Sequence, residues 1–217
     1  MTTQLLKVLT PKTKIPFGLF ILVWILVLYM LPQKFPIFEG QLVPVTFVDR
    51  IIPLDSWWIW IYVSYYFYLI SAFLAAHGKN SNQIFYSFFV SAILGTILFF
   101  LFPTIIDRDL HPLIDTTSLS GWLLSMIRTT DAPLNCAPSM HIAMTTIACG
   151  TFVRERTWYT WPSIVWALLI FYSTMATKQH YWWDVVFGFA LGLFVFGFFD
   201  RAIYVEPERF SKPLVNR

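Results

Sequence analysis

Residues 80–106 read NSNQIFYSFFVSAILGTILFFLFPTII, a run of 27 residues without a charged side chain. A helix needs about 20 predominantly apolar residues to cross the roughly 30 Å hydrocarbon core of a bilayer, so this run is long enough to span one. Its apolar residues surround the helix instead of marking one stripe, which is typical of helices buried in lipid. We therefore expect a membrane-spanning helix over 82–104.

Similar uncharged runs recur along the whole chain. The last of them, 185–199, lies between Asp184 and Asp200 and is short, but it can span if Asp184 sits in a polar cavity near one surface. The sequence predicts an all-α, polytopic integral membrane protein, a single membrane domain over 1–217 with six transmembrane helices. The six helices are expected near 15–33, 56–76, 82–104, 138–153, 157–177 and 182–201.

The composition supports a membrane protein and argues against other classes. Hydrophobic residues make up 57% of the chain and charged residues only 12%, whereas about 25% is usual in a soluble domain. Two cysteines exclude a disulfide scaffold and a Cys-rich zinc module. The net charge of +3 is small, so nucleic acid is not an expected partner.

The distribution of Lys and Arg predicts the orientation of the bundle, because basic residues are enriched in cytoplasmic segments. With six spans both termini share a side, and ten Lys and Arg residues lie on that side against five on the other. We expect both termini to be cytoplasmic. The membrane is expected to be a bacterial inner membrane or a eukaryotic endomembrane. The ten residues are Lys7, Lys12, Lys14, Lys79, Arg154, Arg156, Arg201, Arg209, Lys212 and Arg217.

The longer loops are on the opposite, periplasmic or lumenal side. Loops 105–137 and 178–183 are the expected catalytic loops. Within the first, residues 118–128 (SLSGWLLSMIR) have the pattern of a short amphipathic helix lying along the membrane surface. In the last predicted helix, Gly188-x3-Gly192 favours close packing against a neighbouring helix.

Polar residues gather on this external side in two places, and the first is 135–141, NCAPSMH. Proline is favoured at the first position of a helix, so Pro138 is expected to begin the fourth span. The amides of the first turn have no intrahelical partners and, with the helix dipole, form a site for an anion such as phosphate. Asp131 and Asn135 lie near this motif and are candidates to contact a polar headgroup.

The second place is 173–184, STMATKQHYWWD. His180 and Asp184 are four residues apart and therefore share a helix face. A carboxylate that accepts the Nδ1 proton fixes the tautomer of the imidazole and leaves Nε2 free to attack. His141 is expected at a similar depth, so that two imidazoles, a carboxylate and a helix N-terminus meet in one external cavity. His111 could approach this cavity only if its loop folds back.

The paired motifs Pro-Ser-Met-His (138–141) and Ser173…His180-x3-Asp184 resemble the signature of the type 2 phosphatidic acid phosphatase superfamily. Cys-Ala-Pro-Ser-Met-His and Lys-Gln-His-Tyr-x-x-Asp-Val look closest to the branch that contains inositol phosphorylceramide synthases. The resemblance implies that His180 is a nucleophile that forms a phosphohistidine, that Asp184 orients it, and that His141 is the general acid and then the base. It also implies phosphate binding by Ser139 and neighbouring amides, Met140 included.

The chain departs from the family pattern at its cations. The arginine that follows the serine in the family is Thr174 here, and the family's first motif, Lys-x6-Arg-Pro, has no clear match. Arg108, after the third span, is the first candidate to replace this charge, and Lys178 is the second. A guanidinium binds phosphate bidentately, whereas an ammonium acts as a point charge.

The sequence therefore predicts a metal-independent lipid phosphate phosphatase without a cofactor, acting on a lipid phosphate or phospholipid. One alternative is a phosphotransferase that moves a phospho-headgroup onto a lipid or another alcohol. A second is a lipid-binding or transport protein that has kept the fold, which the loss of the family arginine at Thr174 would favour. A metal site is not expected, because two histidines and one carboxylate are a sparse ligand set. Homo-oligomerisation is left open.

Overall fold

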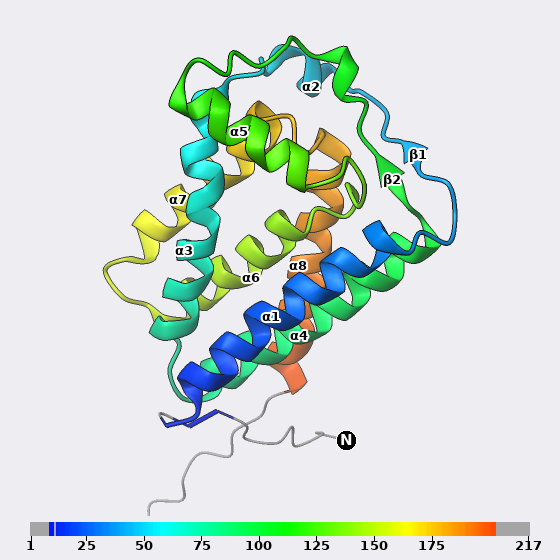
Figure 1. The fold of residues 1–217 in the computed structure, drawn as a ribbon. Helices are drawn as coiled ribbons and strands as arrows, with labels where there is room; N and C mark the ends of the chain where they lie inside the picture. The colour runs from blue at the N-terminus through cyan, green and yellow to red at the C-terminus, as the bar shows by residue number, and fades with distance from the viewer. Residues whose placement is uncertain (1–8, 11, 203–217) are drawn as a thin grey trace, which may run out of the picture.

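Helices dominate the computed structural model of the chain, which describes residues 9–10 and 12–202 (Figure 1). Within this part, four helical segments are long and apolar enough to cross a membrane. They are Lys14–Lys34 (α1), Ser56–Ala75, Gly78–Leu101 (α4) and Trp182–Arg201. The second segment consists of the 3-10 turn η1 (Ser56–Trp58) and helix α3 (Ile59–Ala75), and the fourth lies within α8 (Trp182–Ala202). Two further helices, α6 (Met140–Glu155) and α7 (Thr160–Ala176), are shorter. The six-span count therefore remains a prediction.

The observed helix bounds differ most from the expected ones at α4. This helix begins at Gly78 instead of residue 82. The first turns carry polar side chains, which in the sequence are typical of a loop. In the structure Ser81 and Gln83 are buried, and they donate hydrogen bonds to backbone carbonyls of other segments. It ends at Leu101, because Pro103 disfavours a helical conformation in the residue before it. The other spans begin and end within three residues of their expected bounds.

Helix α6 occupies the centre of the bundle and packs against α3, α4, α7 and α8. Most of its residues are buried. The hydroxyls of Thr146 and Thr151 donate to carbonyls one turn earlier, so these polar side chains are satisfied inside the bundle. The Pro-Ser-Met-His motif at the start of α6 is therefore attached to a helix that is mostly buried inside the bundle.

Two glycines let α8 approach α6 closely. A Cβ atom added to Gly188 would lie 2.4 Å from the carbonyl oxygen of Ser139, and one added to Gly192 would lie 2.6 Å from that of Ala143. No side chain larger than hydrogen fits at these distances. The predicted close packing at Gly188-x3-Gly192 is confirmed, and the partner helix is α6.

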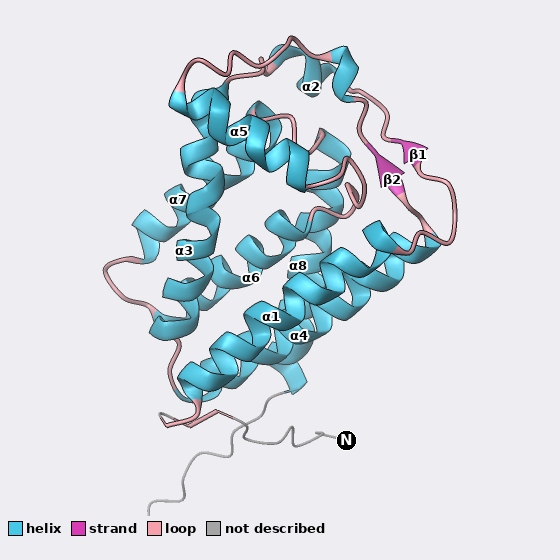
Figure 2. Cartoon of the chain, in the orientation of Figure 1, coloured by secondary structure: helices cyan, strands magenta, loops and turns pink. Residues whose placement is uncertain are grey.

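The non-cytoplasmic segments of the sequence analysis form a cap at one end of the bundle (Figure 2). The first residues of α1 and the last of α8 lie at the opposite end (Figure 1). Four of the basic residues used to orient the chain, Lys7, Arg209, Lys212 and Arg217, lie outside the described residues. The cap contains β1 (Gln41–Leu42), α2 (Phe47–Ile51), β2 (Thr104–Ile105), η2 (Arg108–Leu110) and α5 (Leu119–Thr130).

Strands β1 and β2 correct the expectation of a purely helical chain. They pair in parallel, with Gln41 opposite Thr104 and Leu42 opposite Ile105. Two-residue strands are too short to produce a periodic pattern, so sequence analysis had no signal for them. Helix α5 was expected over 118–128 and extends two residues further, to Thr130.

The glycine contacts generate a stability prediction. Gly188→Ala is expected to lower the free energy of unfolding by about 1–3 kcal/mol, because the new methyl group collides with the backbone of α6. Gly197→Ala is the matched control on the same helix, since nothing lies within 4 Å of a Cβ atom there. Thermal unfolding in detergent measures both variants. Equal unfolding midpoints would contradict the close packing.

Candidate active site

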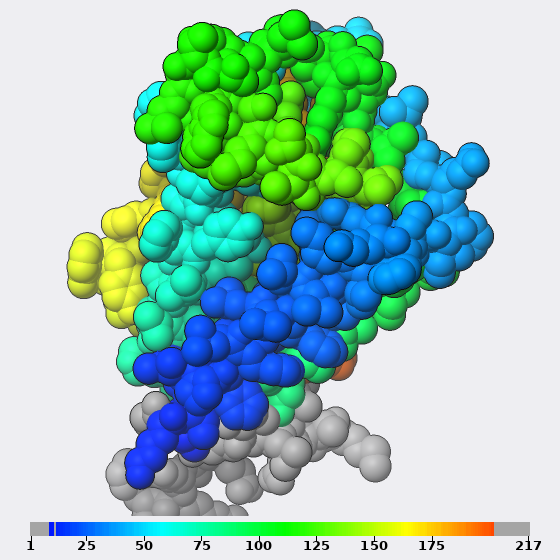
Figure 3. Space-filling model, viewed as in Figure 1, coloured from blue at the N-terminus to red at the C-terminus, as the bar shows by residue number. Residues whose placement is uncertain are grey.

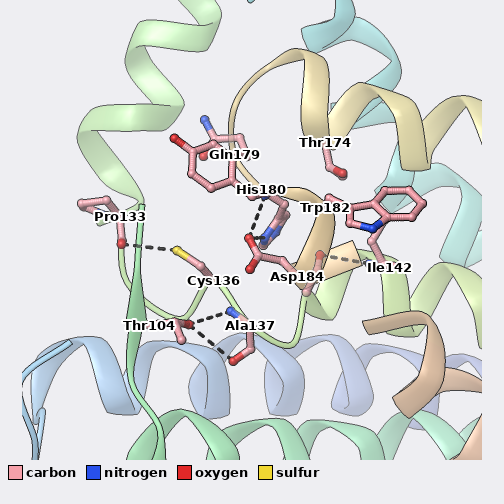
Figure 4. A network of polar contacts seen from close by, with 12 residues as sticks. Thr104, Pro133, Cys136, Ala137, Ile142, Thr174, Gln179, His180, Trp182 and Asp184 are labelled. Carbon is pink, nitrogen blue, oxygen red and sulfur yellow. Dashed lines mark hydrogen bonds and ion pairs between the residues drawn. The ribbon is translucent and has the colours of Figure 1, made fainter. Parts of the chain in front are cut away.

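The pair His180 and Asp184 lies at the start of α8. The Nδ1 atom of His180 is 3.5 Å from Oδ2 of Asp184, and the carboxylate is fully buried (Figure 4). The same oxygen accepts a 2.8 Å hydrogen bond from the amide of Tyr181, which fixes the carboxylate. Because Nδ1 faces Asp184, Nε2 is on the far side of the ring. This is the arrangement required for an oriented imidazole nucleophile.

Ser139 joins the start of α6 to the start of α8. Its hydroxyl caps α6 by accepting from the amide of Ile142, at 3.4 Å. Its own amide donates to the carbonyl of Asp184 at 3.0 Å. The Ala137–Pro138 peptide is cis, and the amide of Ala137 donates to the hydroxyl of Thr104 in β2 (Figure 4). The two sequence motifs are therefore in direct contact.

His141 lies beside this junction. Its ring centre is 5.8 Å from that of His180, so the two predicted imidazoles do share one site. The rings of Tyr62 and Tyr65 on α3 pack against His141, at centre distances of 4.6 and 4.5 Å. The sulfur of Met140 packs on Gly95 of α4. Only its amide, at the start of α6, is in a position to face an anion.

Several buried polar atoms around this junction have no hydrogen-bond partner among the described residues. Buried polar groups are nearly always paired, so such a group needs a ligand or water to satisfy it. Five of these atoms belong to this region. They are Nε2 of His141, Nδ1 of His180, Oδ1 of Asp184, Nε2 of Gln179 and Nε of Arg128.

Two guanidinium groups, those of Arg108 and Arg128, lie near this region. Arg108 donates to the carbonyls of Arg128 (2.7 Å) and Asp131 (3.0 Å) and to the side-chain oxygen of Gln179 (3.4 Å). Arg128, on α5, donates to the carbonyl of Thr177 at 3.0 Å. Burial and the charge of Arg108 lower the pKa of Arg128 to about 10. Sequence analysis missed Arg128, because it belongs to the amphipathic pattern of α5.

Lys178 is buried and holds the cap to the bundle. Its ammonium donates to the carbonyls of Asp49 (2.7 Å) and Ile52 (2.5 Å). Burial lowers its pKa, and the carboxylate of Asp49 acts in the opposite direction. Asp49 also accepts from the amide of Trp182 at 2.8 Å and caps α2 through Thr46. Two of the three ammonium protons of Lys178 are thus directed at carbonyls, and its phosphate-binding role remains a prediction.

The loop of His111 does fold back toward the site. Nε2 of His111 is 2.8 Å from the hydroxyl of Tyr181, the residue after His180. Burial and then the charges of Lys178 and Arg128 lower the pKa of His111. Burial and nearby carboxylates, including those of Asp49 and Asp107, raise the pKa of Tyr181 to about 12.

Thr174, at the position of the family arginine, is fully buried and has a structural role. Its carbonyl accepts from the amides of Gln179 (3.0 Å) and His180 (3.1 Å), which closes the turn between α7 and α8. Its hydroxyl donates to the carbonyl of Phe171. Thr174 therefore offers no positive charge to an anion at this site.

A cavity of about 290 Å³ opens beside His141. Helices α1 and α3 form its walls, and the end of α5 covers it. Most of its lining is apolar, but it includes the carboxylate of Asp131 and the rings of four tyrosines. The tyrosines are Tyr29, Tyr62, Tyr65 and Tyr66.

The helical fold and the two joined motifs define a class of membrane protein, and comparison with known families identifies it. A family model described as PAP2 superfamily matches residues 38–198. The chain belongs to the PAP2 superfamily, which suggests phosphatase or phosphotransferase activity. No curated protein and no solved structure matches the chain. The inositol phosphorylceramide synthase-like branch is not distinguished and stays a prediction.

The contacts of Asp49 generate a second prediction. Asp49→Ala removes the acceptor of the Trp182 amide and the cap of α2, and it leaves Lys178 without its nearest carboxylate. We expect a loss of about 2–5 kcal/mol in the free energy of unfolding, because buried groups lose their partners. Glu39→Ala, at an exposed position of the same segment, is the control. Thermal unfolding of both variants checks this, and an unchanged midpoint for Asp49→Ala would contradict it.

Proposed function

We propose that the protein transfers the phosphoryl group of a membrane lipid phosphate or phospholipid through a phosphohistidine at His180, and that water is the final acceptor. The observation that carries this proposal is the placement of two imidazole rings 5.8 Å apart, one of them backed by a buried carboxylate. At that separation a single phosphate group can contact both rings. Membership of the PAP2 superfamily supports the same chemistry.

In the first step, Nε2 of neutral His180 attacks phosphorus, and the bond from phosphorus to the lipid oxygen breaks. The carboxylate of Asp184, whose Oδ2 lies 3.5 Å from Nδ1 of His180, stabilises the positive charge that develops on the ring. His141, protonated, gives its proton to the departing oxygen. The products of this step are the lipid alcohol, neutral His141 and phosphohistidine.

In the second step, neutral His141 takes a proton from water as the water attacks phosphorus. The bond from phosphorus to Nε2 of His180 breaks, and inorganic phosphate leaves. His141 returns to its protonated form, so the cycle closes without a net change in the protein. His141 thus acts as acid and then as base, as in other two-step transfers.

Phosphoryl transfer depends mainly on positioning and on neutralising negative charge. We assign this neutralisation to the guanidiniums of Arg108 and Arg128, to the hydroxyl of Ser139, and to the first-turn amides of α6. The pair of arginines supplies the charge that Thr174 lacks. Among the described residues there is no group of three His, Cys, Asp or Glu side chains that could hold a metal ion.

We further propose that α1, α3, α4, α6, α7 and α8 all cross the membrane, with α6 surrounded by other helices of the bundle. The ends of α1 and α8 lie together, opposite the cap (Figure 1). The excess of Lys and Arg in the segments that the sequence analysis assigned to the side of the termini supports a cytoplasmic location for that side. The cap and the site then lie on the periplasmic or lumenal side.

A phosphotransferase is the second candidate, and the cavity beside His141 is the observation that favours it. After the first alcohol leaves, a second alcohol in this cavity could attack the phosphohistidine in place of water. Incubation of the purified protein with labelled lipid phosphates, with and without alcohols, separates the two reactions. Release of inorganic phosphate identifies the phosphatase, and a new phospholipid identifies the transferase.

The proposed nucleophile gives a direct test. His180→Ala is expected to abolish turnover and labelling by a ³²P-labelled lipid phosphate, and Asp184→Asn is expected to lower kcat by about a hundredfold or more. His77→Ala is the matched control, since this exposed histidine pairs with Glu155 and precedes α4 at the opposite end. Turnover that survives in His180→Ala would contradict the mechanism and favour a lipid-binding function.

The role of His141 has its own signature. His141→Ala should slow the release of a lipid alcohol strongly but that of an acidic phenol only weakly, because an acidic leaving group needs little protonation. Comparison of kcat for a lipid phosphate and for p-nitrophenyl phosphate measures this difference. An equal loss with both substrates would exclude His141 as the acid.

The assignment of Arg128 is tested by substitution. Arg128→Ala is expected to lower kcat/KM by about 10- to 150-fold, the range for loss of one charged hydrogen bond. It should also weaken inhibition by inorganic phosphate. Arg154→Ala is the control, because Arg154 pairs with Asp200 at the far end of the bundle. Unchanged phosphate inhibition in Arg128→Ala would remove Arg128 from the phosphate site.

A further inference from the structure

The cavity beside His141 has two chemically different parts. Its lower part is lined by apolar side chains of α1 and α3, and Leu26 and Tyr66 at its edge are also exposed on the outer surface. In Figure 3 this hollow lies between the blue side chains of α1 and the cyan side chains of α3, below the green of α5. Its upper part ends on His141 and contains the carboxylate of Asp131.

This shape fits the alcohol half of a lipid phosphate ester. The apolar part, next to surface that faces hydrocarbon in a membrane, suits an acyl chain. The upper part, at His141, is where the departing oxygen receives its proton in the proposed mechanism. A water-soluble headgroup would not require the apolar walls.

Asp131 is an unexpected residue in such a place, because its negative charge disfavours binding of a phosphate nearby. One of its oxygens, Oδ1, accepts from the hydroxyl of Tyr29 (2.9 Å) and from the side-chain amide of Gln33 (3.0 Å), and so joins α5 to α1. An asparagine could accept the same two bonds through its own Oδ1. These bonds therefore do not explain why the residue is charged.

The second oxygen of Asp131, Oδ2, accepts no hydrogen bond from any residue in the described part of the chain. Because Asp131 is one of the residues that line the cavity, we take this oxygen as the candidate to bind a ligand there. A carboxylate accepts hydrogen bonds and cannot donate them, so its partner must carry an O–H or N–H group. Asn135, the other nearby polar candidate, is buried and donates to the carbonyl of Tyr29, so it is not available in the same way.

We propose that this cavity binds the leaving alcohol of the lipid, and that Asp131 selects lipids that carry a free hydrogen-bond donor, a hydroxyl or an amide N–H, close to the phosphate ester. This inference rests on the proposed function and specifies its substrate class. The donor bonds to Oδ2, the chain lies between α1 and α3, and the ester oxygen faces His141. A lipid without such a donor leaves the carboxylate desolvated and unpaired, which is costly.

A matched pair of lipids tests this selection in the unmodified protein. The first is 1-oleoylglycerol 3-phosphate, with a free hydroxyl at carbon 2, and the second is its 2-deoxy analogue, which differs by that hydroxyl alone. We expect kcat/KM to be at least about tenfold higher for the first lipid, the effect of one hydrogen bond to a charged group. Equal values for the two lipids would overturn the inference.

Asp131→Asn then identifies the selecting atom. The asparagine keeps the acceptor for Tyr29 and Gln33 but replaces the charged Oδ2 with a neutral amide, so the preference should fall to the roughly few-fold effect of a neutral hydrogen bond. Tyr29→Phe is the control, because it removes one bond to Oδ1, leaves the carboxylate in place, and should retain the preference. A preference that persists in Asp131→Asn would overturn the assignment to Asp131.

The same assay separates failure of this inference from failure of the proposed function. If the wild-type protein releases phosphate from both lipids at equal rates, only the selection is wrong. If it releases none from either, and no ³²P label appears on His180, the proposed function is wrong and the inference falls with it. Because the lipid pair is compared in the wild-type protein, a misfolded variant does not remove the test.

Discussion

The contact between Asp184 and Ser139 holds the starts of α8 and α6 together, and the rest of the site depends on it. The carbonyl of Asp184 accepts from the amide of Ser139, while its carboxylate faces His180 and accepts from the amide of Tyr181. One buried residue thus orients an imidazole and fixes the position of a helix N-terminus. The contact is possible only because Gly188, one turn further along α8, lets the two backbones approach.

In the proposed mechanism, positive charge comes from the cap, because Thr174 on α7 occupies the position of the family arginine. Thr174 uses its carbonyl to close the turn before His180, and the guanidiniums of Arg108 and Arg128 lie over that turn through their bonds to Gln179 and Thr177. Burial is the larger cause of the lowered pKa of Arg128, and repulsion by the charge of Arg108 adds to it. An anion between them would relieve that repulsion. The cap is therefore part of the proposed catalytic apparatus and not only a cover.

Much of the fold and part of the site could be predicted from sequence because the signals are local. Apolar runs such as 80–106 exceed the thickness of a bilayer, and Gly188-x3-Gly192 marks a close helix contact. The spacing of His180 and Asp184 is a property of a single helix, and the structure brings their side chains together. By contrast, the polar start of α4 looks like a loop, because burial of Ser81 and Gln83 depends on distant segments.

By itself, the sequence determined that the chain has helices long and apolar enough for a membrane, since hydropathy is readable within one segment. It also carried two histidine motifs that resemble those of the PAP2 superfamily. Only the tertiary structure decided which cations accompany the histidines and which residues line the cavity. Lys178 is directed at the carbonyls of Asp49 and Ile52, and Arg128 joins the site from α5. These choices depend on contacts between residues 49 to 129 positions apart, for which a single sequence carries no local signal.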